Sequence, residues 1–100
     1  MSRLLENNKK FQVIKLTWRE YAAATDSWGL CDACGQNSSE DPLFYVAVLD
    51  HVFCEMCFKA WYDTAKRYSV DMPKEQEAFI RMKHKLMDLG CWENETDSIQ

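Results

Sequence analysis

Two cysteine pairs constrain this 100-residue chain more than any other feature of its sequence. Cys31 and Cys34 form a first C-x-x-C motif, Cys54 and Cys57 form a second one, and nineteen residues separate the two pairs. Each motif places two thiol groups on one side of a tight turn, and a chain reversal between the motifs can bring the two turns together. The pattern therefore predicts that four thiols converge at one site.

A tetrahedral Zn²⁺ ion suits four thiolate ligands, and two C-x-x-C pairs at this separation match the spacing of structural zinc sites. The second pair lies at an expected strand-to-helix junction, where the positive end of the helix dipole stabilises thiolate. We therefore expect one structural Zn²⁺ ion bound by Cys31, Cys34, Cys54 and Cys57. Four cysteines saturate the ion, so no position remains for a catalytic water.

Other uses of the cysteines match the pattern less well. Buried free cysteines are common in protein cores, and a thioredoxin-like redox site needs a single C-x-x-C beside a βαβ unit. Tetrahedral sulfur also suits iron, but CEMCF lacks the glycine that follows the second pair in rubredoxin-like sites. The fifth cysteine, Cys91, is expected to pack as a small hydrophobic residue beside Trp92.

Local signals predict the elements of the first half of the chain. The β-branched residues in 11–16 indicate a strand, and Thr17 and Glu20 have the spacing of a capping box that begins a short helix. This helix should end near Thr25. Residues 43–54 are typical of a β-hairpin, with Asp50 and His51 near its turn.

Two helices are expected in the second half of the chain. The first begins near residue 55, because apolar residues then recur at helical spacing: Phe58, Trp61, Tyr62, Ala65 and Tyr68. The second covers residues 73–89, with Asp71 as N-cap and a stop at Gly90. Its expected apolar face consists of Phe79, Met82, Leu86 and Leu89, widened by Ile80 and Met87. The polar, acidic residues 93–100 are expected to form a flexible tail.

The order of a cysteine turn, a loop, a hairpin and a helix that carries the second pair resembles the treble-clef zinc fingers over residues 29–69. The resemblance implies that the first pair supplies knuckle ligands and the second pair helix-end ligands. It implies a fold and a metal but no activity. The expected fold class is α+β, as one domain over residues 1–100. A short N-terminal strand and helix and a C-terminal helix flank the zinc unit.

Composition limits the cellular setting of the chain. With 47% hydrophobic and 28% charged residues it has the composition of a globular domain. The longest apolar stretch, residues 43–49, is too short to span a bilayer, and the first ten residues lack the apolar core of a secretory signal. We therefore expect a cytoplasmic protein without membrane association.

No set of residues indicates an enzyme. Asp50-His51 resembles the Asp-His pair of HNH nucleases, some of which carry paired C-x-x-C motifs, but His51 lies only three residues before Cys54. Zinc deaminases need H-x-E and P-C-x-x-C motifs, and the chain has neither. We interpret Asp50 and His51 as residues of the hairpin turn, and His84 as solvent-facing.

Two classes of partner are open. The chain has thirteen aromatic residues, and Trp28 and Trp92 are candidate anchors for a protein partner. A nucleic acid is the alternative, because the two expected helices carry Lys59, Lys66, Arg67, Arg81, Lys83 and Lys85. The net charge of −4 and the acidic residues interleaved with these bases oppose phosphate binding. We therefore expect a protein-binding adaptor or regulator.

Overall fold

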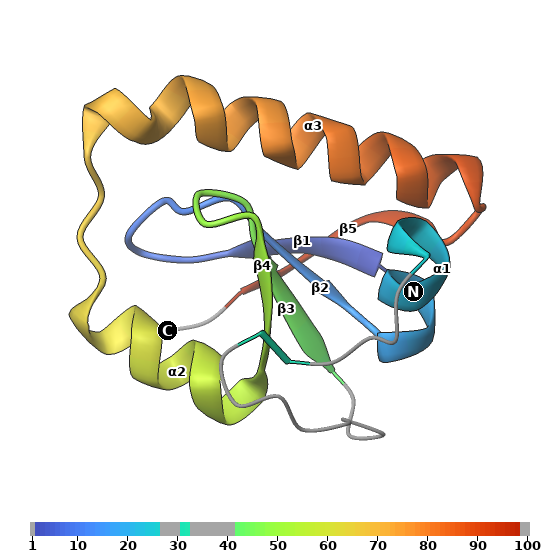
Figure 1. The fold of residues 1–100 in the computed structure, drawn as a ribbon, viewed down its shortest axis with the longest axis horizontal. Helices are drawn as coiled ribbons and strands as arrows, with labels where there is room; N and C mark the ends of the chain where they lie inside the picture. Colours follow the sequence, from blue (N-terminus) through green and yellow to red (C-terminus); the bar gives the residue numbers. More distant parts are fainter. Residues whose placement is uncertain (1, 27–30, 33–41, 99–100) are drawn as a thin grey trace.

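The computed structural model describes residues 2–26, 31–32 and 42–98. Its described part is a mixed α+β arrangement in which helices cover both faces of a five-stranded sheet (Figure 1). Helix α3 (Met72–Asp88) lies on one face and α2 (Glu55–Thr64) on the other. The shorter helix α1 (Trp18–Thr25) contacts α3. The expected α+β class is confirmed in this broad form.

The sheet combines a hairpin with strands from both ends of the described chain. In chain order the strands are β1 (Ser2–Glu6), β2 (Val13–Leu16), β3 (Leu43–Val46), β4 (His51–Cys54) and β5 (Trp92–Ser98). Their order in the sheet is β4-β3-β2-β1-β5. The β1–β5 pair is parallel and the other three pairs are antiparallel.

The capping box at the start of α1 is confirmed. The Glu20 N–H donates to Thr17 Oγ1 over 3.2 Å, and the Thr17 N–H donates to Glu20 Oε1 over 2.9 Å. Each side chain thus satisfies a backbone donor that the first helical turn leaves without a partner. The helix ends at Asp26, whose φ of 54° is left-handed and interrupts the helical hydrogen bonds.

The hairpin over residues 43–54 is also confirmed. Phe44 pairs with Phe53 and Val46 with His51, so the chain reverses between β3 and β4. Asp50 takes a φ of 54° in this turn, a conformation that Asp tolerates better than most residues.

Helix α2 is shorter than its apolar pattern predicts. It ends at Thr64, and Tyr68, expected on its buried stripe, is 58% exposed. The cause is a contact from the loop between β1 and β2. Lys9 Nζ donates to the carbonyl oxygens of Tyr62 and Ala65, the latter over 3.0 Å. A cation at this position stabilises the C-terminal end of a helix, and the backbone is already extended at Ala65.

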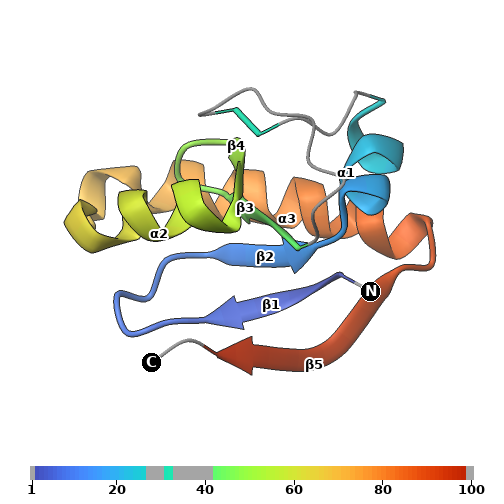
Figure 2. The same cartoon turned by 90° about the horizontal axis from the view of Figure 1, so that it is seen from below.

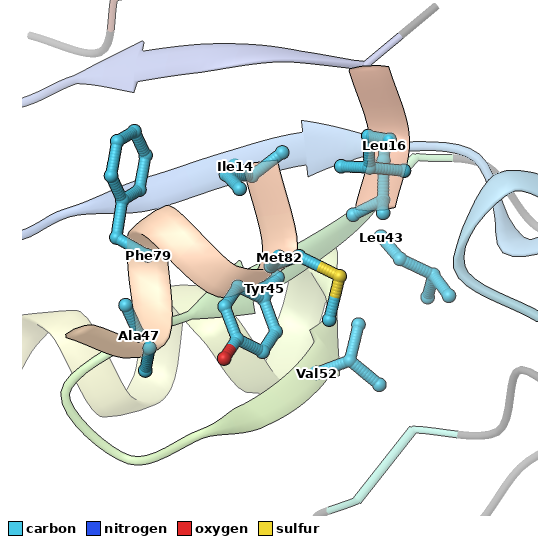
Figure 3. Packing of buried hydrophobic residues seen from close by; sticks show 10 residues of the cluster. Ile14, Leu16, Leu43, Tyr45, Ala47, Val52, Phe79 and Met82 are labelled. Atoms are coloured by element: carbon cyan, nitrogen blue, oxygen red, sulfur yellow. The ribbon is translucent and has the colours of Figure 1, made fainter. Parts of the chain in front are cut away.

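Helix α3 begins and ends within a residue of the expected limits, and Gly90 follows it with a φ of 73°. Ala78, Phe79, Met82 and Leu86 face the sheet and are buried. Figure 3 shows Phe79 and Met82 among the sheet residues of this core, including Ile14 and Tyr45. The apolar face predicted for α3 is, however, wider than the face that is buried. Ile80, Met87 and Leu89 are 41%, 52% and 51% exposed, because the sheet contacts only one flank of the helix.

A second core fills the opposite face of the sheet, beneath α2. Phe58 of α2 stacks on Phe44 of β3 with ring centroids 4.6 Å apart, and Trp61 lies 4.9 Å from Phe11. The same buried cluster also contains Leu5, Val13, Val46 and Phe53 of the sheet and Cys31. The aromatic residues of α2 are therefore largely used for packing.

The segment after α3 corrects an expectation. Residues 93–98, expected in a flexible tail, belong to β5 and pair with β1 in parallel. The Ser2 N–H donates to the Cys91 carbonyl oxygen over 2.7 Å at the start of this pairing. Within the described ranges, no helix combines the length and apolar content needed to cross a membrane.

A buried carboxylate on α3 binds two segments that are distant from each other in the sequence. Glu75 is 2% exposed and accepts hydrogen bonds from the Gln12 N–H over 3.0 Å and from Arg67 Nη2 over 2.9 Å. The ion pair with Arg67 holds the connection between α2 and α3. The bond from Gln12 holds the residue before β2.

We expect Glu75→Gln to lower the free energy of unfolding by about 2 kcal/mol, because a buried charge-assisted hydrogen bond is replaced by a weaker one. Urea unfolding of both proteins at the same metal concentration measures the change. Glu77→Gln is the matched control, since Glu77 is exposed on the same helix, and it should change stability by less than about 0.5 kcal/mol. Equal stabilities of the two variants would contradict the assigned role of Glu75.

Candidate metal centre

Three thiol groups come together where β4 ends and α2 begins. Cys54 is the N-cap residue of α2 and Cys57 lies in the first turn of that helix. Cys31 reaches the same place from a segment more than twenty residues earlier. The three Sγ atoms lie within 4.8 Å of one another. Cys31 is buried and the other two are half-buried.

This spacing fits a shared metal ion. In a tetrahedral thiolate site with Zn–S bonds of about 2.3 Å, neighbouring sulfur atoms lie about 3.8 Å apart. Small side-chain adjustments bring the three Sγ atoms to that separation. Among the described residues, no disulfide joins these three cysteines. The three close cysteines can therefore bind a metal ion.

The backbone around Cys54 and Cys57 favours the thiolate form that a metal requires. The first turn of a helix has backbone N–H groups without helical partners, and the macrodipole places partial positive charge there. Cys54 takes an extended conformation with a φ of −70° and a ψ of 168° before the helix begins. The strand-to-helix junction expected from the sequence thus positions both thiols at the helix N-terminus.

Asp32 holds the segment of Cys31 against the hairpin. The Asp32 N–H donates to the Val52 carbonyl oxygen over 2.8 Å, and the Val52 N–H donates to Asp32 Oδ2 over 2.8 Å. His51 Nδ1 lies 3.3 Å from the same carboxylate oxygen. Residue 32 therefore continues the hydrogen bonding of the sheet past β4, and it places Cys31 beside the α2 N-terminus.

Aromatic and charged residues surround the other side of the hairpin. Burial, together with the nearby Asp32 and Asp50 carboxylates, raises the pKa of Tyr21 on α1 to about 12. The Tyr45 hydroxyl donates to Asp50, which also pairs with Arg81 over 3.2 Å. Asp50 and His51 thus both make contacts that stabilise the hairpin turn and its surroundings.

Asp32 and Tyr21 were not among the residues singled out from the sequence. Asp32 lies within the first C-x-x-C motif, and its position next to Cys31 is the sequence feature that could have indicated a role at the site. Its pairing with Val52 depends on the position of β4, which local sequence does not specify.

Two of the sequence-predicted site residues, Cys34 and Trp28, lie outside the described residues. Trp92, proposed as an interface anchor, is half-buried. Its ring lies 6.4 Å from that of Phe79, and Lys83 Nζ lies 5.2 Å above it. Trp92 therefore covers the edge of the core beneath α3.

The six basic candidates do not come together on one surface. Lys59 lies on α2, Lys66 and Arg67 follow that helix, and Arg81, Lys83 and Lys85 lie on α3 across the sheet. Three of them pair with carboxylates of the chain: Lys59 with Glu55, Arg67 with Glu75, and Arg81 with Asp50. The charge that they offer to a phosphate backbone is correspondingly reduced.

Comparison with models of protein families, with curated proteins and with solved structures finds no match to this chain. The resemblance to treble-clef zinc fingers therefore rests on the cysteine spacing and on the order of the elements.

We expect the purified protein to bind one metal ion per chain and Cys54→Ser to lose most of it, because the variant removes a ligand at the helix N-terminus. Native mass spectrometry and elemental analysis measure the metal content. Cys91→Ser is the control and should retain the ion. The Cys91 thiol donates a hydrogen bond to the Leu86 carbonyl oxygen over 3.4 Å, and burial raises the pKa of this thiol. A metal-free wild-type protein with disulfides among these cysteines would contradict the metal site.

Proposed function

We propose that this chain is a zinc-stabilised protein-interaction module, an adaptor or regulator in which the metal is structural. The observation that carries the proposal is the convergence of the Cys31, Cys54 and Cys57 thiols within 4.8 Å. Cys34 is the fourth ligand in this proposal, because it completes the first C-x-x-C motif. Four thiolates fill a tetrahedral zinc shell and leave no position for a reacting water.

We further propose that residues 29–69 form a treble-clef-like unit within the larger sheet. The order of Cys31, the β3–β4 hairpin and α2 with its two cysteines supports this. The hairpin also pairs with β2 through β3, so this unit is continuous with the rest of the sheet. The zinc would then stabilise the β4 side of the fold. Its binding energy would contribute directly to folding, as it does in small zinc domains.

Exposed apolar side chains support a protein partner. Met56, Tyr68 and Val70 are 81%, 58% and 82% exposed, and they lie on α2 and on the connection to α3. Large apolar side chains of this kind contribute to protein interfaces when they gather with others. A nucleic-acid partner is less well supported, because the basic candidates lie on opposite faces and three are paired with carboxylates.

We expect the tagged full chain, used as bait in extracts of its own cells, to retain a protein partner at a fixed stoichiometry. Cys54→Ser should lose this partner together with the metal, and Cys91→Ser should keep it. Quantitative mass spectrometry of the eluted proteins measures the ratio. Failure of the zinc-loaded wild type to retain any protein at a fixed ratio would contradict the proposed function.

In fluorescence anisotropy, labelled DNA and RNA should not bind the protein even at low salt. Phosphate contacts are strongest under that condition, so low salt gives binding the best chance of detection. Binding that weakens steeply as salt increases would instead favour the nucleic-acid alternative.

A further inference from the structure

The two edges of the sheet differ. At one edge, Asp32 continues the hydrogen bonding past β4. At the other edge, β5 has β1 as its one partner among the described strands. The outer backbone groups of such an edge strand can accept a further strand.

The helices do not extend over the outer side of β5 (Figure 2). Helix α3 packs on β2, β3 and β4 and also contacts Leu4 of β1 and Trp92 of β5, whereas α2 packs chiefly on β3 and β4. Figure 2 views the sheet from the α2 side and shows neither helix drawn across β1 or β5. The ion pair between Arg3 of β1 and Glu93 of β5 accordingly leaves both side chains 27% exposed. A sixth strand can therefore extend the sheet beside β5 without displacing a described helix.

An exposed apolar flank of α3 lies towards this edge. Lys83 identifies the flank, because its ammonium group lies over the ring of Trp92, the first residue of β5. Ile80 and Met87 precede and follow Lys83 by three and four residues, so they share its side of the helix. Both are substantially exposed although the sequence pattern predicts that they are buried. They can cover apolar side chains of a strand added next to β5.

Charge distinguishes between the possible occupants of the edge. The segment 92–98 contains three acidic residues and no basic residue. Pairing of β5 with β5 of a second copy would align six carboxylates along one ladder, which like-charge repulsion opposes. A basic segment is attracted to the same carboxylates. This attraction speeds its association with β5 and favours one register of strand pairing.

We propose that β5 is an interaction edge that accepts an extended segment of a partner protein, with basic residues alternating with apolar ones, as a sixth strand. Backbone hydrogen bonds to β5 supply affinity, and the apolar side chains of the segment pack against Ile80 and Met87. This inference rests on the proposed protein-interaction function and names its surface and the chemistry of its partner.

The test uses the full chain, loaded with zinc and labelled with ¹⁵N, and a synthetic seven-residue peptide of alternating lysine and valine. The peptide matches the seven residues of β5 in length. Titration followed by amide chemical shifts should show saturable changes in β1, in β5 and around residues 80–87. Binding should weaken as salt increases. A peptide of alternating glutamate and valine should produce no such changes.

The double variant Ile80→Ser/Met87→Ser should raise the dissociation constant of the lysine–valine peptide about tenfold, through lost apolar contacts. Leu49→Ser is the matched control, because Leu49 is exposed in the turn between β3 and β4, away from β5, and it should leave the constant unchanged. The metal content and spectral dispersion of each variant verify its fold. Unchanged affinity of the double variant, shifts centred on residues 68–72, or an equal response to both peptides would overturn the proposal. A dimer formed through β5 would also overturn it.

The double variant also separates this inference from the proposed function. If zinc-loaded wild type and double variant retain the same partner from extract equally well, the interaction function stands and the β5 edge is not its surface. If the wild type retains no partner at a fixed ratio, the proposed function itself fails. Loss of the partner in the double variant, with retention by Leu49→Ser, supports both.

Discussion

The convergence of three thiols at the junction of β4 and α2 is the constraint on which one side of this fold depends. Of the ten residues of α2, all of them described, Phe58 is the one that is buried. The helix is thus held by a few aromatic contacts and by Lys9 at its C-terminal end, and three thiols that could bind a metal ion meet at its N-terminal end. A metal ion at the thiols would join the segment of Cys31 to the junction of β4 and α2, where hydrophobic burial alone is modest.

The cysteines and the two cores act on different parts of the sheet. Helix α3 packs over the central strands through a continuous apolar face and a buried carboxylate. The cysteines lie at the β4 edge, where Asp32 continues the sheet by one residue. The central strands are held by packing, and the β4 edge is held both by Val52 and Phe53 in the two cores and by the hydrogen bonds of Asp32. The β5 edge is held by backbone pairing to β1 and by the covering ring of Trp92. The outer side of β5 has no strand beside it among the described residues, which is why we propose it as the partner-binding edge.

What the sequence predicted well was local. The capping box of α1, the hairpin and the limits of α3 all depend on residues within a few positions of one another. The convergence of Cys31 with Cys54 and Cys57 was also readable, because ligand spacing reflects the geometry of a site. The predicted end of α2 was wrong because it depends on a contact from Lys9, which lies more than fifty residues earlier and donates to carbonyl oxygens at the C-terminal end of the helix. The exposure of Ile80 and Met87 depends on which flank of α3 the sheet contacts, and helical periodicity does not contain that information.

The pairing of β1 with β5 has a consequence for the order of folding. Arg3 and Glu93 form an ion pair across ninety positions of sequence, so this contact closes nearly the whole described chain into a loop. The entropy of closing such a loop grows only slowly with its length, but contacts of this kind form late and slow the folding reaction. Until β5 arrives, β1 is itself the open edge of a four-stranded sheet. A chain in which β5 has not yet paired would therefore present a strand edge with leucines at positions 4 and 5, and unpaired backbone groups at such an edge favour aggregation.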